Sequence, residues 1–164
     1  MSKVVVKASQ TILRVVLINF TILLAVLGVH EIGHVIFGMF MGCTNGKAII
    51  FDTLSDGPYS EIVCLNKMNH DIVYLGGLIA SVGFASLFLL TGNSPERNLF
   101  FVILGLSIIS ASFDIVEVFA MQPLFYISLI SGIGFLSFGE FLITSAYMER
   151  ESLFKKEDIP FGLR

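Results

Sequence analysis

The chain has 164 residues, of which 55% are apolar and 14% charged, and its formal net charge is −3. A water-soluble domain of this length has too much surface to be so apolar, so we expect lipid to cover part of it. The slightly acidic balance excludes a nucleic-acid partner, which requires a basic surface. Composition and length therefore predict a single domain in a lipid bilayer, as a multi-pass protein of the cell membrane.

The first apolar stretch and the segment after it differ in character. Residues 11–41 are long enough to cross a bilayer, which takes about 20 helical residues, and Gly42 marks the end of this helix. Residues 47–51 and 59–65 are short and rich in β-formers, and Ser55-Asp56-Gly57-Pro58 is a turn sequence between them. This segment therefore predicts a β-hairpin associated with the membrane.

Three further stretches are long enough to span. Residues 71–91 form the second, and residues 94–121 form the third, which opens with Ser94 as N-cap and Pro95 at the first helical position. Residues 124–147 form the fourth. The predicted fold is an all-α integral membrane protein with about four transmembrane helices and one hairpin between helices 1 and 2. Two units follow from this pattern, a membrane-embedded domain over residues 1–148 and a charged C-terminal tail over residues 149–164.

The chemistry begins with His30-Glu31-Ile32-Gly33-His34 in the first stretch. On a helix, His-Glu-x-x-His places two imidazoles on one face, where both bind one Zn²⁺ and the glutamate acts as general base on the zinc-bound water. Ionisable groups inside a membrane are costly and mark functional sites. The alternative is a buried polar cluster that bonds one helix to another.

A catalytic zinc site needs a third protein ligand, and Asp114 is the preferred candidate. Asp114 and His34 each lie seven residues before the end of a predicted helix, so both lie at the same depth, about 10 Å from that end. Glu117 is one turn further along the same face and is the alternative third ligand, or a group that orients a histidine. Glu140 in the fourth stretch is interpreted as a packing carboxylate.

With these residues, the chain resembles the site-2 protease family of intramembrane zinc metalloproteases, over about residues 20–121. His30, Glu31 and His34 match the family's first motif, and residues 47–65 resemble its membrane-associated hairpin. Gly77-Leu78-Ile79-Ala80-Ser81 matches its Gly-x-x-x-Asn/Ser/Gly motif, and Asp114 falls where its zinc-binding aspartate is expected. The resemblance implies substrate-binding or packing roles for Gly77 and Ser81.

The sequence departs from the family around Asp114. The family's aspartate sits in an Asn-Pro-rich segment that ends in Leu-Asp-Gly, whereas this chain reads Ser-Ala-Ser-Phe-Asp-Ile over residues 110–115. The choice between Asp114 and Glu117 therefore stays open. A protease of the prenyl-protein-processing type would favour Glu117, but chains of that kind are longer and have more membrane helices.

The function expected is hydrolysis of peptide bonds in membrane-spanning or membrane-proximal substrates, with Zn²⁺ as cofactor and Glu31 activating its water. The partners are then the bilayer and a transmembrane protein substrate, while a regulatory membrane partner and an oligomer stay open. The alternative function is a non-catalytic metal-binding membrane protein, either a transporter component or a scaffold.

Two features concern the compartment. Cys43 and Cys64 could pair, but two cysteines are too few to define a compartment, and isolated thiols are the preferred interpretation.

Eight of the ten basic residues lie on the side of the termini, while Lys47 and Lys67 lie on the hairpin side. The positive-inside rule places the termini in the cytoplasm and therefore the zinc site nearer the outside of the cell. In the family, by contrast, the site opens toward the cytoplasm. The orientation is therefore open.

Overall fold

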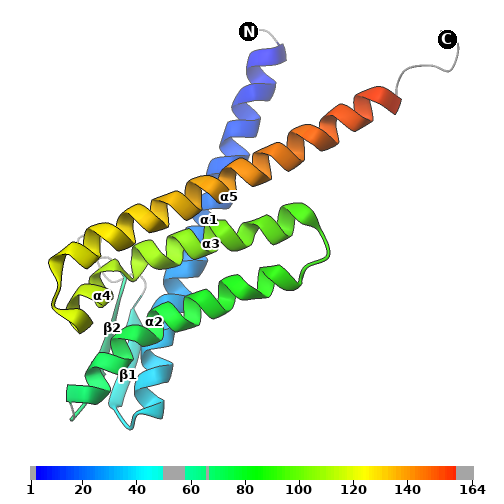
Figure 1. Ribbon diagram of the computed structural model, residues 1–164. Helices are drawn as coiled ribbons and strands as arrows, with labels where there is room; N and C mark the ends of the chain where they lie inside the picture. Colours follow the sequence, from blue (N-terminus) through cyan, green and yellow to red (C-terminus); the bar gives the residue numbers. More distant parts are fainter. Residues whose placement is uncertain (1–2, 50–57, 66, 158–164) are drawn as a thin grey trace, which may run out of the picture.

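A computed structural model describes residues 3–49, 58–65 and 67–157 of the chain. The protein is mostly helical, with a two-stranded hairpin between its first two helices (Figure 1). Its elements in chain order are α1 (Lys3–Phe40), β1 (Thr44–Ile49), β2 (Tyr59–Val63), α2 (Lys67–Leu87), the short 3₁₀ helix η1 (Phe88–Leu90), α3 (Ser94–Ser110), α4 (Ser112–Phe119) and α5 (Gln122–Glu157).

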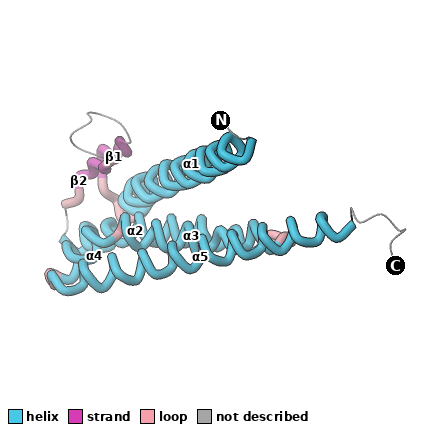
Figure 2. The backbone as a smooth tube through the Cα atoms, turned by 90° about the horizontal axis from the view of Figure 1, so that it is seen from above, coloured by secondary structure: helices cyan, strands magenta, loops and turns pink. Residues whose placement is uncertain are grey.

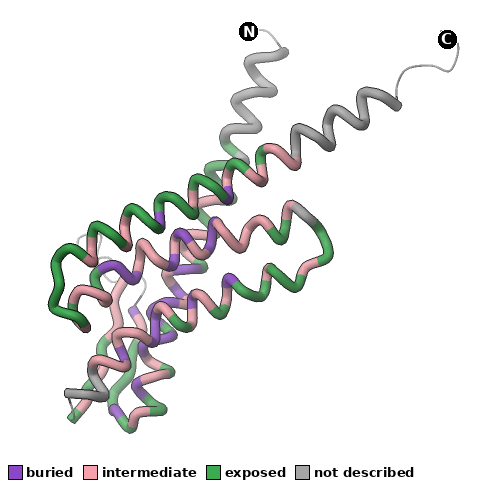
Figure 3. The backbone as a smooth tube through the Cα atoms, in the orientation of Figure 1, coloured by how far each residue is buried: buried purple, intermediate pink, exposed green. Residues whose placement is uncertain are grey.

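Three helical segments of the described chain are long and apolar enough to cross a membrane, namely Val15–Phe40, Asp71–Leu90 and Gln122–Ala146. A fourth candidate consists of α3 and α4 together, which are bent by 47° relative to each other. Large apolar side chains lie exposed along α1 and α5, where a soluble protein would present polar ones. The outward faces of these helices therefore suit contact with lipid (Figure 3).

The helices form a layer with α1 packed across it. In Figure 1, α2, α3 and α5 lie side by side with α3 in the middle, and Figure 2 shows α1 and the hairpin on the same face of this layer. The central contacts join α1, α2 and α3 through the buried side chains of Val26, Ala85 and Ile103. Helix α5 packs on α3 instead. This arrangement leaves the inner face of α1 against α2 and α3, and that face carries the histidine motif.

Close approach of α1 to α2 depends on glycine. A Cβ added to Gly33 would lie 2.6 Å from both the Ala80 Cβ and the Gly76 carbonyl oxygen, closer than side chains tolerate. Small residues at a helix crossing are how membrane helices pack tightly, since lipid gives them little hydrophobic drive to associate. Gly33 lies within the histidine motif, so the same turn of α1 both contacts α2 and carries the site.

Helix α1 ends close to the predicted position. Gly42 has a φ of 76°, and the amide of Cys43 donates to the Gly38 carbonyl oxygen at 2.9 Å. A left-handed glycine after the last helical turn satisfies carbonyls that the helix leaves free. The chain then turns directly into β1, which places the hairpin beside the last turns of α1.

The predicted third helix is wrong in two respects. It is not continuous over residues 94–121, because the chain bends at Ala111, between α3 and α4. Its N-cap residue is Asn93 rather than Ser94, which is already the first helical residue.

Serine hydroxyls explain the bend in the absence of proline or glycine. Ser107, Ser110 and Ser112 donate to carbonyl oxygens three or four residues earlier, and such bonds compete with the helical ladder.

The predicted fourth helix is longer than expected. Helix α5 begins at Gln122 and continues to Glu157, so it includes the first part of the segment interpreted as a charged tail. Its apolar portion faces outward, and small residues let it approach α3. A Cβ on Gly132 would lie 2.8 Å from the Gly105 carbonyl oxygen, so glycine is needed at this crossing too.

The predicted hairpin is confirmed. Strands β1 and β2 pair antiparallel, with Thr44 opposite Val63 and Lys47 opposite Glu61. The predicted turn over residues 55–58 lies outside the described residues, apart from Pro58.

Cys43 and Cys64 flank the Thr44–Val63 pair and form a disulfide, so the preference for isolated thiols is wrong. Antiparallel pairing brings the two cysteines together, because each stands one residue outside a paired position.

Candidate metal centre and active site

Helix α1 presents three ionisable side chains of the motif on one inward face. His30, Glu31 and His34 are all buried, with exposed fractions of 3%, 7% and 5%. Their nearest ligand atoms lie within 4.8 Å of one another, so the three side chains form a group able to hold a metal ion. The predicted juxtaposition of these three residues is therefore present in the folded chain, near the end of α1 that leads into the hairpin.

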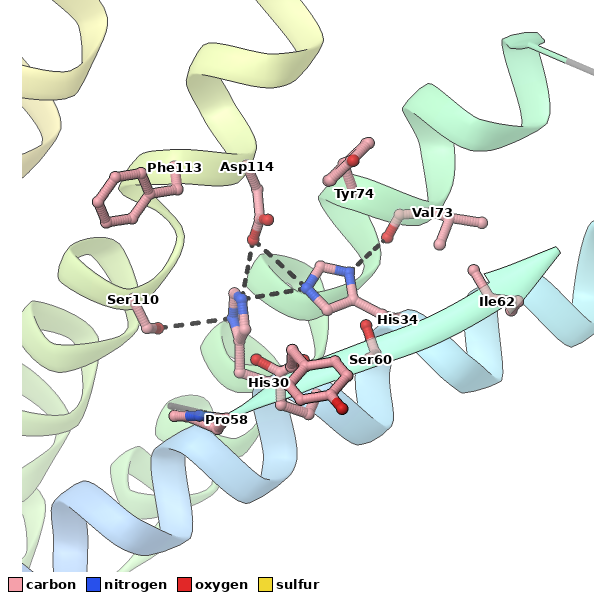
Figure 4. A pocket seen from close by; sticks show the side chains of 12 residues that line it. His30, His34, Pro58, Ser60, Ile62, Val73, Tyr74, Ser110, Phe113 and Asp114 are labelled. Carbon is pink, nitrogen blue, oxygen red and sulfur yellow. Dashed lines mark hydrogen bonds and ion pairs between the residues drawn. The ribbon is translucent and has the colours of Figure 1, made fainter. Parts of the chain in front are cut away.

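Asp114 completes the group from another helix (Figure 4). Its Oδ2 lies 2.8 Å from the Nε2 atom of His30 and 3.4 Å from the Nε2 atom of His34, while the two Nε2 atoms are 3.1 Å apart. Tetrahedral zinc with ligands at about 2.1 Å places the ligand atoms about 3.4 Å from one another. One of the three separations equals this value and the other two are 0.3 and 0.6 Å shorter, so small outward shifts of the side chains would give the spacing of a tetrahedral site.

The ring of His34 is oriented by the backbone of α2. Its Nδ1 lies 2.7 Å from the carbonyl oxygen of Val73, an atom that can only accept a hydrogen bond. The Nδ1 atom therefore carries the proton, and in the neutral ring Nε2 keeps its lone pair toward His30 and Asp114. A carbonyl that fixes the tautomer in this way is typical of metal-binding histidines. The Ser110 hydroxyl lies 3.5 Å from Nδ1 of His30, on the opposite side of that ring from Asp114.

Gly77 leaves the space in which the two imidazoles lie. A Cβ at this position would stand 2.6 Å from Nε2 of His34 and 2.7 Å from Cε1 of His30. Ser81, one turn further along α2, is fully buried, and its hydroxyl donates to the Gly77 carbonyl oxygen at 2.9 Å. The second motif of the sequence therefore contacts the site as a packing surface beneath the histidines.

The bend between α3 and α4 directs Asp114 toward the histidines. Asp114 lies in the first turn of α4, directly after the break at Ala111. Ala111 and Ser112 are buried, which anchors the break against the rest of the bundle. The change in direction turns the start of α4 so that the carboxylate points at α1 (Figure 4). The bend between α3 and α4 is therefore what brings the Asp114 carboxylate to the two histidines.

A cavity of about 300 Å³ opens beside these residues. Its walls come from α1, α2, the α3–α4 break and the strand β2, and the Ser60 hydroxyl of β2 lies within hydrogen-bonding reach of the Glu31 carboxylate. The hairpin is thus one wall of the cavity rather than a separate appendage. The lining residues are His30, Glu31, His34, Pro58, Tyr59, Ser60, Ile62, Val73, Tyr74, Ser110, Phe113 and Asp114.

The two candidate carboxylates are placed differently. Asp114 lines the cavity and contacts both histidines, whereas Glu117 is exposed and does not line the cavity. Glu140 lies on α5, half-buried, and is also outside the cavity lining.

The sequence pattern did not single out Val73, Ser110 or Ser60. Their contacts depend on helix rotation and strand placement, which the sequence pattern does not define, although the run of serines around Ala111 was a visible signal of a bend.

No protein-family model, curated protein sequence or solved structure matches the chain. The resemblance to the site-2 protease family therefore rests on the motifs of the sequence and their order. The function has to be inferred from the side chains that the fold brings together.

Proposed function

We propose that the protein is an intramembrane zinc metalloprotease of the site-2 protease type with four membrane spans, of which α3 and α4 together form the third in chain order. One observation carries the proposal. Two buried imidazole nitrogens and a carboxylate oxygen from a distant helix lie 2.8 to 3.4 Å apart, beside a buried glutamate that lines the same cavity. Two histidines, one carboxylate and an adjacent glutamate are the parts of a hydrolytic zinc site.

The donor set suits zinc. His30, His34 and Asp114 supply two nitrogen ligands and one oxygen ligand, which leaves the fourth position for water or substrate. A zinc ion in such a site is a Lewis acid toward the peptide carbonyl and lowers the pKa of water to near 7. The carbonyl of Val73 holds the His34 ring in the tautomer that binds metal.

Glu31 is the proposed general base. Its carboxylate is buried next to the histidines and lines the cavity in which a substrate carbonyl would lie. It takes a proton from the attacking water and gives it to the leaving amine as the peptide bond breaks. Ser60 lines the same cavity, and its hydroxyl is the proposed hydrogen-bond donor to this carboxylate.

The proposed substrate is a membrane-spanning or membrane-proximal polypeptide in an extended conformation. A helical substrate shields its own carbonyls, so it must unwind locally before cleavage. Strand β2 lines the cavity through Tyr59, Ser60 and Ile62, and β1 is the one strand that pairs with it among the described residues. The other edge of β2 is where we place the substrate. An unwound substrate can pair with that edge while its side chains reach the cavity.

The test combines metal content with cleavage. Protein purified in detergent should contain about one zinc per chain and should cut substrates in a membrane fraction, with products identified by mass spectrometry. A zinc chelator should abolish cleavage, and added zinc should restore it. Cleavage that is unaffected by the chelator would contradict the proposal. Full zinc content without any cleavage would favour the non-catalytic metal-binding alternative instead.

A further inference from the structure

The two ends of the helix bundle differ chemically. One end, which we call the hairpin end, comprises β1, β2, the Cys43–Cys64 disulfide and the turn between α4 and α5 (Figure 1). The other, the terminal end, comprises the start of α1, the turn between η1 and α3, and the end of α5. The cavity lies toward the hairpin end, because β2 forms one of its walls and His34 is only six residues before the last residue of α1.

The disulfide indicates the compartment at the hairpin end. Cys43 and Cys64 are the only cysteines of the chain, and they join the exit of α1 to the entry of α2. Structural disulfides persist in oxidising compartments and are rare in the cytosol, where thiols are kept reduced. A disulfide at the hairpin end is therefore expected when that end faces away from the cytoplasm.

The basic residues give an independent indication. Only Lys47 and Lys67 lie at the hairpin end, whereas eight basic residues occur before residue 15, in the 91–97 segment or after residue 149. Short cytoplasmic segments of membrane proteins carry the excess of Lys and Arg, so this distribution places the terminal end in the cytoplasm. The eight residues are Lys3, Lys7, Arg14, Arg97, Arg150, Lys155, Lys156 and Arg164.

We infer that the hairpin end faces an oxidising, extracytoplasmic compartment, and that the cavity receives its polypeptide from that side. Charge and disulfide chemistry agree on this orientation although neither depends on the other. The substrate part of the inference rests on the proposed function, while the orientation does not. Under this inference the substrates are polypeptides with an unwound segment on the extracytoplasmic side, and the disulfide stabilises the wall of the cavity that they meet.

The orientation can be tested by labelling the full chain in bacterial spheroplasts. Two variants share a Cys43→Ser/Cys64→Ser background, one with Thr44→Cys at the hairpin end and one with Gly92→Cys at the terminal end. Both positions are exposed, and nothing lies within 4 Å of a Cβ at Gly92. A membrane-impermeant maleimide should label the Thr44→Cys chain in intact spheroplasts and the Gly92→Cys chain only after permeabilisation. The opposite pattern would overturn the inference.

The unmodified chain provides a second measurement that requires no variant. In intact spheroplasts it should bind no impermeant maleimide until an impermeant reductant is added, and then two per chain. Labelling of two free thiols only after permeabilisation, with no need for reductant, would overturn the inference. Neither measurement uses catalytic activity, so a wrong orientation and a wrong proposed function give different results.

Discussion

Asp114 lies 2.8 Å from His30 although the two residues are 84 positions apart and belong to different helices. This contact converts a pair of histidines on one helix into a three-sided group of ligand atoms. It depends on the bend at Ala111 and on the space left by Gly77, so the geometry of the site belongs to the bundle as a whole. Substitutions at these positions therefore test the account.

The third ligand can be tested by matched changes at two carboxylates. Asp114→Asn keeps the shape of the side chain but removes the charge that a zinc ligand supplies. Removing a residue that only hydrogen-bonds to a metal ligand lowers metal affinity by up to about 100-fold. We expect the loss of a direct ligand to lower zinc affinity by at least this factor. Glu117→Gln, the same chemical change at an exposed position one turn away, should leave zinc content unchanged. Zinc per chain, measured by mass spectrometry after dialysis against a competing chelator, separates the two. Loss of zinc in Glu117→Gln with retention in Asp114→Asn would assign the ligand to Glu117.

The packing role of Gly77 predicts a large effect from one methyl group. Gly77→Ala would place a Cβ 2.6 Å from Nε2 of His34, so the histidines must move. Overpacking of this kind costs about 1–3 kcal/mol, and we expect zinc affinity and cleavage to fall together. Gly83→Ala on the same helix is the control, because nothing lies within 4 Å of its added Cβ and alanine favours helix. Equal zinc affinities in the two variants would show that Gly77 does not define the site.

The disulfide should hold the hairpin against the bundle. Its loop spans 21 positions, and closing a loop of that length contributes about 3 kcal/mol in the chain-entropy model. Cys43→Ser/Cys64→Ser should therefore increase hydrogen exchange in β1 and β2 while leaving exchange in α3 unchanged. Cleavage should also fall, because β2 and its Ser60 form one wall of the cavity. Reduction of the unmodified protein should reproduce both effects. Unchanged exchange in the strands would show that pairing alone maintains the hairpin.

Much of the architecture follows from simple patterns in the sequence. Long apolar runs require helices that lipid can cover, and short β-rich runs around turn residues require a hairpin. The proximity of Asp114 to the histidines was predicted from the need of a zinc site for a third ligand, from the matching depth of the two positions, and from the motif order of the family that the chain resembles. These features depend on local composition and spacing, which a single sequence contains.

Other features depend on tertiary contacts that spacing does not describe. The bend at Ala111 arises from several serine hydroxyls acting together, each of which is compatible with a straight helix on its own. The disulfide depends on strand register, which brings Cys43 opposite Cys64 only once Thr44 pairs with Val63. The contact of Val73 with His34 depends on the rotation of α2 and involves a backbone carbonyl, so no side-chain pattern could reveal it.

The central claim is tested most directly by the Glu31→Gln variant, assayed for zinc and for cleavage in the same preparation. Glutamine keeps the size of the side chain and its place beside Ser60 but cannot accept a proton. We predict unchanged zinc content and a loss of cleavage of about 100-fold to 10,000-fold, the range that general-base catalysis contributes. Full cleavage by the Glu31→Gln protein with its zinc in place would contradict the account.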